Sequence, residues 1–327
     1  MSDSLWLNIG VFIIAASVIT FAGIRLAKLA DRLADRTGMG EAVTGALFLG
    51  GSTSLPGIVT SITAAAGGHA ELAVSNAIGG IAAQTTFLAI ADMTYSKANL
   101  EHAAVSVPNL MQGTLLSILL TLPLLAANSL NVSIWQVHPA TILLIGIYIY
   151  GMRLIAEAKE APMWGPTQTD ETKPDEPEEE PREESSLLRM WLRFCGYAAL
   201  LGTAGFFVAR SGVAITKLTG LSETVVGGLF TAVSTSLPEL ITAIAAVQQG
   251  ALTLAVGDII GGNSFDVLFL AFSDLAYREG SIYHAITRRD TFLIMLTLLM
   301  TAILLLGLLR REKHGIANIG LEGFSIL

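Results

Sequence analysis

One short motif occurs twice in this chain, and the two copies stand a fixed distance apart. Ser-Thr-Ser-Leu-Pro fills positions 52–56 and returns at 234–238, an offset of 182 residues. Other matches at the same offset are Ile-Gly-Gly at 78–80 and 260–262, Phe-Leu-Ala at 87–89 and 269–271, Asp92 and Asp274, and Tyr95 and Tyr277. Unrelated apolar segments would not keep proline, glycine and aspartate in register. The sequence therefore predicts an internal duplication.

The repeated segments belong to a series of apolar runs of about 20 residues, the length that crosses a bilayer as a helix. Hydrophobic residues make up 52% of the chain and charged residues 14%, whereas a soluble domain carries roughly 25% charged residues. Strands of a membrane barrel would instead be ~10 residues long and would alternate in polarity. We therefore predict an all-α membrane protein with spans at 5–27, 41–66, 70–94, 103–127, 135–155, 187–212, 223–248, 252–276 and 288–309.

The duplication and the spans divide the chain into three parts. We expect a first five-helix repeat at 1–155, with its motif region at 41–95. A second repeat follows at 187–327, with its motif region at 223–277. Between them, 156–186 alternates prolines with acidic residues and contains no apolar run that could build a core. We interpret it as a disordered, solvated linker.

The second repeat is incomplete at its C-terminus. The offset places 143–145, early in the fifth span, opposite 325–327, where the sequence ends. Either the tenth helix was lost or the sequence is truncated. Because the region before this point stays in register, we expect truncation.

Basic residues near the span ends orient the chain in the membrane. Four of them lie between positions 25 and 36, after the first span, so we expect the N-terminus outside the cell membrane and the acidic linker in the cytoplasm. The second half is less regular, because Arg210 and Lys217 fall on the predicted outer side. Five spans per repeat is an odd number, so the halves enter the membrane with opposite polarity. Secondary transporters are built from such inverted repeats.

The second copy of the motif carries a proline and a carboxylate inside an apolar span. Pro238 cannot donate a hydrogen bond to the carbonyl of Ser234, which frees that acceptor at membrane depth. Glu239 would cost roughly 2.5 kcal/mol or more near the bilayer centre without compensation. The hydroxyls, carbonyl and carboxylate of 234–239 are oxygen ligands of the kind that hard cations bind. The competing interpretation is a proline kink whose hydroxyls cap the helix and whose glutamate snorkels.

Several other function classes find no support in the sequence. A single cysteine, Cys195, excludes an intrachain disulfide and a cysteine-based metal cluster. The five histidines are scattered, and no basic stripe points to nucleic acid. No nucleophile–base set or phosphate-binding loop suggests an enzyme. We expect no cofactor.

The two motif regions together resemble the alpha repeats of the sodium/calcium exchangers, a family of the calcium/cation antiporter superfamily. Those repeats read Gly-Thr-Ser-Leu-Pro-Glu and, one helix later, Gly-Asn-x-Ile-Gly-Ser-Asn-x-x-Asn/Asp. The second repeat here reads Ser-Thr-Ser-Leu-Pro-Glu at 234–239 and Gly-Asp-Ile-Ile-Gly-Gly-Asn-Ser-Phe-Asp at 257–266. The resemblance implies two inverted repeats, with discontinuous helices around a cation site at the membrane midplane.

The resemblance also implies a set of ligands for the transported cations. Glu239 and Asp266 would be the acidic ligands, and Thr235 and Ser236 would supply hydroxyl or carbonyl oxygens. Their partners from the first half would be Thr53, Ser54 and Gln84. Sodium and calcium ions would be substrates rather than cofactors.

The first repeat departs from the family pattern where the ligands lie. Gly57 stands at the glutamate position and Gln84 at the asparagine or aspartate position. Fewer anionic ligands should weaken calcium binding. Asp258 is an auxiliary candidate, yet on a helix it lies about 12 Å along from Asp266 and some 80° around. It would at best attract cations.

Three functions remain open at this point. The leading one is a secondary antiporter that exchanges sodium for calcium by alternating access. The second is exchange of monovalent cations or protons, because a site with two acids balances two sodium ions or protons as well as one calcium. The third is a structural or regulatory homologue that does not transport. We expect lipid and transported cations as partners, no nucleic acid, a monomer, and Asp92 and Asp274 as packing or interfacial acids.

Overall fold

The computed structural model describes residues 3–37, 48, 50–94, 100, 104–130, 132–160, 186–310 and 326. Within these residues the regular secondary structure is helical, with one isolated bridge between Ile134 and Val137. The first half contains α1 (Leu5–Thr37), α3 (Leu55–Ala66), α4 (Ala70–Met93), α6 (Val107–Ala127) and α7 (Pro139–Glu160). The second half contains α8 (Leu187–Thr219), α9 (Glu223–Val225), η1 (Val226–Thr231), α10 (Ala232–Thr235), α11 (Leu237–Gln249), α12 (Leu252–Asp266), α13 (Leu268–Ala276), η2 (Ile282–Ala285) and α14 (Arg288–Arg310).

The prediction of an all-α membrane protein is confirmed. Among the described residues, seven helices are long and apolar enough to cross a membrane, and the bent pair formed by 223–235 and α11 gives an eighth. α3 is a shorter apolar helix. Most of 41–54, where its span was predicted to begin, lies outside the described residues.

The helices that flank the linker are longer than the apolar pattern indicated. α7 continues to Glu160, and Ser186 caps α8 by accepting a hydrogen bond from the amide of Arg189 at 3.4 Å. α7 therefore extends five residues into the linker predicted for 156–186, because a helix can continue into water beyond its apolar part, whereas α8 begins at Leu187, where its span was predicted to begin. The predictions for 161–185 and for the incomplete C-terminal part fall almost entirely outside the described residues.

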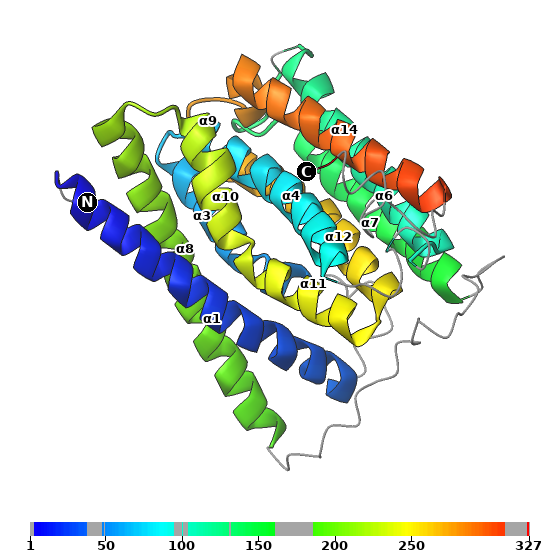
Figure 1. The fold of residues 1–327 in the computed structure, drawn as a ribbon. Coiled ribbons are helices and arrows are strands. Elements are labelled where there is room, and N and C mark those ends of the chain that lie inside the picture. The colour runs from blue at the N-terminus through cyan, green and yellow to red at the C-terminus, as the bar shows by residue number, and fades with distance from the viewer. Residues whose placement is uncertain are drawn as a thin grey trace.

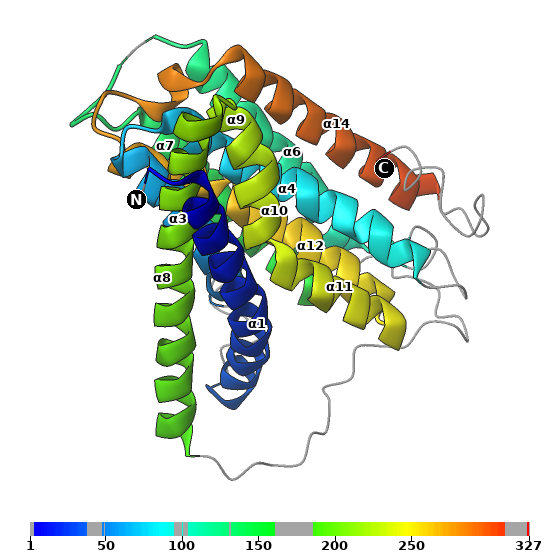
Figure 2. The ribbon, with the colours of Figure 1, turned by 60° about the vertical axis from the view of Figure 1, so that its left-hand side comes forward.

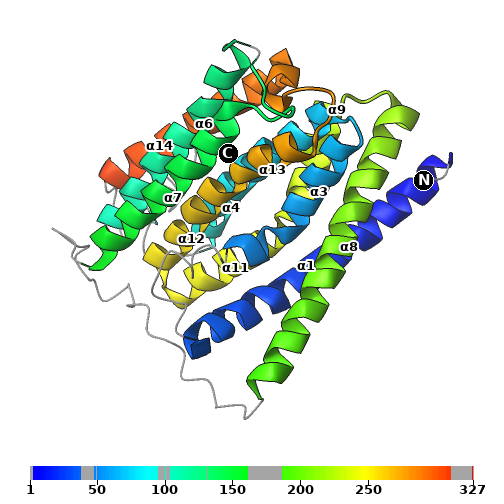
Figure 3. The same ribbon diagram turned by 180° about the vertical axis from the view of Figure 1, so that it is seen from behind.

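The helices form three groups that follow one another across the molecule (Figure 1). α1 and α8 pack against each other on one side, as the turned view of Figure 2 also shows. α3, α4, α11, α12 and α13 form the middle, while α6, α7 and α14 lie on the opposite side (Figure 3). The contacts of α3 with α8, of α11 with α1 and of α12 with α6 join the groups. The middle group is therefore covered on both sides.

Glycines let α1 and α8 approach the proline-containing helices closely. A Cβ atom at Gly23 of α1 would lie 2.5 Å from Cγ of Pro238 on α11. A Cβ atom at Gly205 of α8 would lie 2.6 Å from the carbonyl oxygen of Pro56 on α3. The two glycines are 182 residues apart in the sequence, and so are the two prolines. Equivalent positions of the two halves thus make equivalent contacts.

The span that contains the second motif is interrupted at Ser236. α10 ends at Thr235 and α11 begins at Leu237, and the two parts of the span are bent by 49°. The break is expected here because Pro238, at the start of α11, lacks the amide that would continue the ladder of hydrogen bonds. The π-helical turn η1 precedes the break. Such turns are frequent at functional sites.

Candidate cation-binding site

Four of the predicted site residues meet at the centre of the middle group. Ser54, immediately before α3, donates a hydrogen bond from its hydroxyl to Oδ1 of Asp266 at 2.6 Å. Gln84 of α4 donates from Nε2 to Oδ2 of Asp266 at 2.6 Å. The same nitrogen lies 3.4 Å from the hydroxyl of Ser236, at the break between α10 and α11. All four side chains are buried.

These contacts connect positions that correspond between the two halves. Gln84 and Asp266 are 182 residues apart, so each touches its own counterpart. Ser54 with Asp266 and Ser236 with Gln84 are the same pair of positions taken from opposite halves. Two copies related by a twofold axis bring a position against its own counterpart near that axis. The cluster is therefore where an inverted repeat would place a shared site.

Two carboxylates belong to this cluster. Asp266 is the last residue of α12 and is 2% exposed. Glu239 lies in the first turn of α11, within electrostatic range of Asp266. Its Oε2 atom is buried and has no hydrogen-bond partner among the described residues. Two negative charges that share a buried region need a compensating positive charge.

Two buried amide oxygens near the carboxylates also lack a donor in the described part of the chain. They are Oε1 of Gln84 and Oδ1 of Asn263, which lies one turn before Asp266 on α12. The amide nitrogen of Asn263 is already engaged, since it donates to the hydroxyl of Thr85 at 3.1 Å. A buried acceptor without a donor costs roughly 1–3 kcal/mol. A cation bound among these oxygens would supply the missing partner.

Three predicted ligands do not point their side-chain oxygens at Asp266. The hydroxyl of Thr235 donates to the carbonyls of Thr231 and Ala232 at 3.0 and 3.1 Å. Thr53 donates to the carbonyl of Gly50 at 3.2 Å. Both hydroxyls thus bond within their own helices. Asp258 is exposed on α12, apart from the buried cluster. Its assignment as an auxiliary acid stays a prediction.

Two residues that sequence reasoning did not assign to the site lie beside it. Asn263 belongs to the Gly-Gly-Asn segment of the motif, so its helical spacing from Asp266 could have indicated it. Tyr148 of α7 is 1% exposed and lies within electrostatic range of Asp266. Its ring packs edge-on against Phe265 at 6.0 Å between centroids. No sequence signal connects this fifth span to the motif.

Asp92 and Asp274 accept hydrogen bonds from the backbone that follows α4 and α13, respectively. Oδ1 of Asp92 accepts from the amide of Leu100, and Oδ1 of Asp274 accepts from the amide of Ile282, both at 2.9 Å and both eight residues further along. Asp274 also accepts from the amide of His138 at 2.8 Å and from the hydroxyl of Thr141 at 2.7 Å. These satisfied carboxylates agree with the packing role expected for them.

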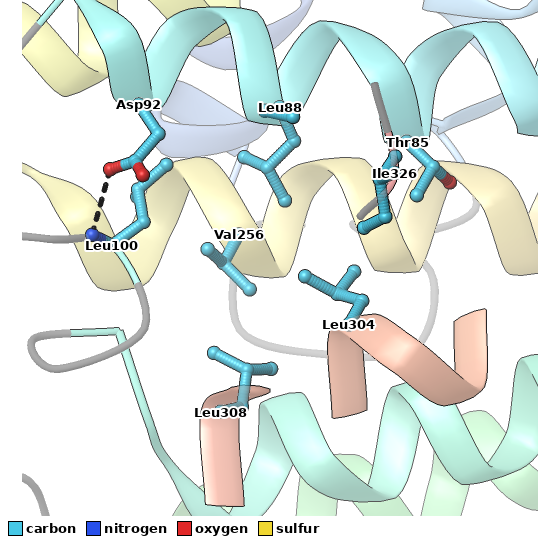
Figure 4. A pocket seen from close by; sticks show the side chains of 9 residues that line it. Thr85, Leu88, Asp92, Leu100, Val256, Leu304, Leu308 and Ile326 are labelled. Atoms are coloured by element: carbon cyan, nitrogen blue, oxygen red, sulfur yellow. Dashed lines mark hydrogen bonds between the residues drawn. The ribbon is translucent and has the colours of Figure 1, made fainter. Parts of the chain in front are cut away.

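A small cavity between α4, α12 and α14 is unsuited to cations. Its volume is about 20 Å³, and leucine and valine side chains line most of it. Figure 4 shows Leu88, Leu304 and Leu308 around it, with Asp92 at its rim already bonded to the Leu100 amide. A cavity of this size holds about one water molecule.

The candidate site differs from a centre that holds a metal ion permanently. Among the described residues, no group of three or more histidine, cysteine, aspartate or glutamate side chains could hold a metal ion. The cluster instead combines two carboxylates with hydroxyl and amide oxygens. Weakly charged oxygen sites of this kind suit a cation that must also leave.

Comparison with known proteins also indicates a cation transporter. The family model described as "Sodium/calcium exchanger protein" matches residues 7–154 and 189–319. The protein CaxA of Alkalimonas amylolytica is 29% identical over 295 residues, which cover 86% of this chain and 85% of CaxA. The match of the family model includes both motif regions.

Two solved structures share the fold. The structure of the sodium-calcium exchanger NCX_Mj soaked with 100 mM Na+ and 10 mM Sr2+ superposes with a TM-score of 0.59 at 18% identity, covering 99% of this chain and 96% of that one. The H+/Ca2+ exchanger CAX superposes with a TM-score of 0.60 at 15% identity, covering 98% of this chain and 79% of that one. At these identities the likeness concerns the fold alone. The fold does not show whether sodium ions or protons are exchanged for calcium.

Proposed function

The chain belongs to the sodium/calcium exchanger protein family, and from that premise we propose that it is a secondary antiporter that exchanges sodium for calcium by alternating access. Members of this family are transporters and not enzymes, and they carry ions as substrates without a cofactor. Sodium moving down its gradient would drive calcium across the membrane in the opposite direction. Both ions would compete for the same oxygens.

The observation that carries the proposal is the set of buried oxygens without donors around Asp266. Oε2 of Glu239, Oε1 of Gln84 and Oδ1 of Asn263 have no hydrogen-bond partner in the described part of the chain. Together with Asp266, Ser54 and Ser236 they would surround one calcium ion or two sodium ions. Calcium takes six to eight oxygen ligands. The carbonyls of Thr53 and Thr235 would complete the shell, because their hydroxyls are turned into their own helices.

The inverted arrangement of the halves supports alternating access. The contacts of Ser54 with Asp266 and of Ser236 with Gln84 repeat at an offset of 182, and the glycine–proline contacts of α1 and α8 do so as well. We propose that 1–155 and 187–327 are inverted repeats that rock around the site. The N-terminus would lie outside a plasma membrane and the linker in the cytoplasm, and the chain would function as a monomer.

A second candidate function is exchange of monovalent cations or protons. Its support is Gly57, which stands where the family pattern has a glutamate. The site is therefore left with two carboxylates instead of three. Two carboxylates are balanced equally well by one divalent ion, two sodium ions or two protons. The site chemistry therefore admits this function, although the family favours sodium/calcium exchange.

The proposal is tested by flux in proteoliposomes that contain the purified protein. Vesicles loaded with sodium and diluted into sodium-free buffer should take up radiolabelled calcium, and Glu239→Gln should abolish the uptake. Glu157→Gln is the matched control, since Glu157 is exposed and pairs with Arg153 at the surface of α7. This control should transport as the wild type does.

Other outcomes decide against the leading function or against the proposed site. Sodium or proton flux that is independent of calcium would establish the second candidate. If no cation moves through the wild-type protein, the chain is a non-transporting homologue. Uptake that survives Glu239→Gln unchanged would remove Glu239 from the site.

A further inference from the structure

An aromatic ring occupies the space that a first-repeat glutamate would need. Gly57 is the counterpart of Glu239 at the offset of 182. A Cβ atom at Gly57 would lie 2.6 Å from Cε2 and 3.2 Å from Cζ of Phe269. Real Cβ atoms essentially never come closer than 3.0 Å to another heavy atom. Even alanine would therefore require the ring to move, and glutamate is much larger.

The ring of Phe269 is held in this position by its neighbours. Phe269 is 3% exposed, and α13, which carries it, packs against α3, which carries Gly57. Its ring lies edge-on to Phe265, with 6.4 Å between centroids. Phe265 in turn lies edge-on to Tyr148. Such aromatic contacts favour one geometry, so the ring cannot turn away without disturbing two others.

Phe269 reaches Gly57 from the helix that follows Asp266. α12 ends at Asp266 and α13 begins at Leu268, and Val267 between them keeps helical backbone angles, so 252–276 forms one span. Phe269 lies three residues after Asp266, one turn further along this span. Glycine at 57 leaves the room that the ring of Phe269 occupies, so the two residues form a complementary pair.

The pair fixes the charge of the candidate site. With position 57 closed to a carboxylate, Glu239 and Asp266 are the acidic side chains among the described residues of the cluster. Their formal charge of about −2 is balanced by one calcium ion or by two sodium ions. A third sodium ion would leave an unbalanced positive charge in a buried, low-dielectric region, which is unfavourable.

We propose that Phe269 is a specificity-determining residue that excludes a third carboxylate at Gly57 and thereby makes the exchange electroneutral, with two monovalent cations for each divalent cation. The inference rests on the proposed function, since it specifies the stoichiometry of the same site. It concerns the number of charges carried and not the identity of the ligands.

Membrane potential provides the test. Proteoliposomes with a fixed sodium gradient are clamped at different potentials with potassium and valinomycin, and the calcium accumulation ratio is measured at equilibrium. Electroneutral exchange gives the same ratio at every potential. Exchange that moves one net charge changes the ratio about 50-fold per 100 mV. The measurement is thermodynamic, so it does not depend on transport rates.

Variants test the role of Phe269 itself. The double variant Gly57→Glu with Phe269→Ala adds a carboxylate and the room for it, and its accumulation ratio should change about 50-fold per 100 mV. The matched control Gly57→Gln with Phe269→Ala has the same volume without the charge and should stay independent of voltage, as should Phe269→Ala alone. Gly57→Glu alone should give far less folded protein than the double variant.

The outcomes separate this proposal from the proposed function. If wild-type vesicles accumulate no calcium under a sodium gradient, sodium/calcium exchange itself fails. If they accumulate calcium with a ratio that depends on voltage, the function stands and the electroneutral stoichiometry is refuted. A double variant that remains independent of voltage, or a Gly57→Glu variant that folds as well as the double variant, would refute the role of Phe269.

Discussion

Glycines bring α4 and η1 into close contact, and alanine at one of them should weaken both fold and site. A Cβ atom at Gly79 of α4 would lie 2.5 Å from Cα and 2.8 Å from the carbonyl carbon of Gly228 in η1. Both are backbone atoms, so no side-chain rotation relieves the collision. Favourable carbon contacts lie near 3.5–4.0 Å, and the two helices would have to separate by about 1 Å.

The separation should have a measurable energetic cost. Adding a methyl group to a packed interior typically costs about 1–3 kcal/mol, which changes the population of the native packing roughly 5- to 150-fold. α4 carries Gln84 and η1 leads to Ser236, so the 3.4 Å contact between them would lengthen. We therefore expect Gly79→Ala to lower both the apparent melting temperature and the affinity for calcium.

Thermal unfolding of the purified protein in detergent, with and without calcium, measures both effects. Each kcal/mol should lower the melting temperature by about 2–4 °C. Gly146→Ala is the control, because apart from its own stretch of helix no described heavy atom lies within 4 Å of the added Cβ, and the position is also inside a helix. Equal melting temperatures and equal calcium shifts for the two variants would refute the reasoning.

Three further substitutions test individual roles. Gln84→Glu places a carboxylate where the amide now donates to Asp266 at 2.6 Å, so we expect a lower melting temperature without cations and a larger stabilisation by calcium, measured by thermal unfolding. Asp274→Asn weakens a carboxylate that accepts three hydrogen bonds and should cost at least about 3 kcal/mol of stability without changing calcium affinity by calorimetry. Gly205→Ala would bring a Cβ 2.6 Å from a backbone oxygen, whereas Gly202→Ala makes an ordinary 3.8 Å contact, so only the former should reduce flux in vesicles.

Each of these three predictions has an outcome that contradicts it. An unchanged calcium shift in Gln84→Glu would place position 84 outside the site. Weaker calcium binding by Asp274→Asn at unchanged stability would make Asp274 a ligand rather than a packing residue. Equal flux through Gly205→Ala and Gly202→Ala would show that the contact between α8 and α3 tolerates added bulk.

Several features of this protein could be read from the sequence because they depend on local spacing. The length of the apolar runs predicted the spans, and the ends of α4, α11 and α14 lie within a few residues of the predicted positions. The repeated motif predicted that Ser54, Ser236 and Asp266 belong together. A helix crosses the membrane wherever enough apolar residues follow one another. A duplication is likewise recognised from matches at a constant offset, without information on how the helices pack.

Other features were decided by the tertiary structure, because they depend on distances between helices. The hydroxyls of Thr53 and Thr235 match the motif, yet in the fold they bond to their own helices. Tyr148 packs against Phe265, the residue before Asp266, although nothing in its own span indicates this. The sequence showed that Gly57 lacks a carboxylate, and the fold showed that Phe269 fills its place. The sequence by itself determined which residues could form a site. Packing between helices decided which oxygens face it and which positions are closed, because side-chain direction and interhelical distance are set by contacts far apart in the chain.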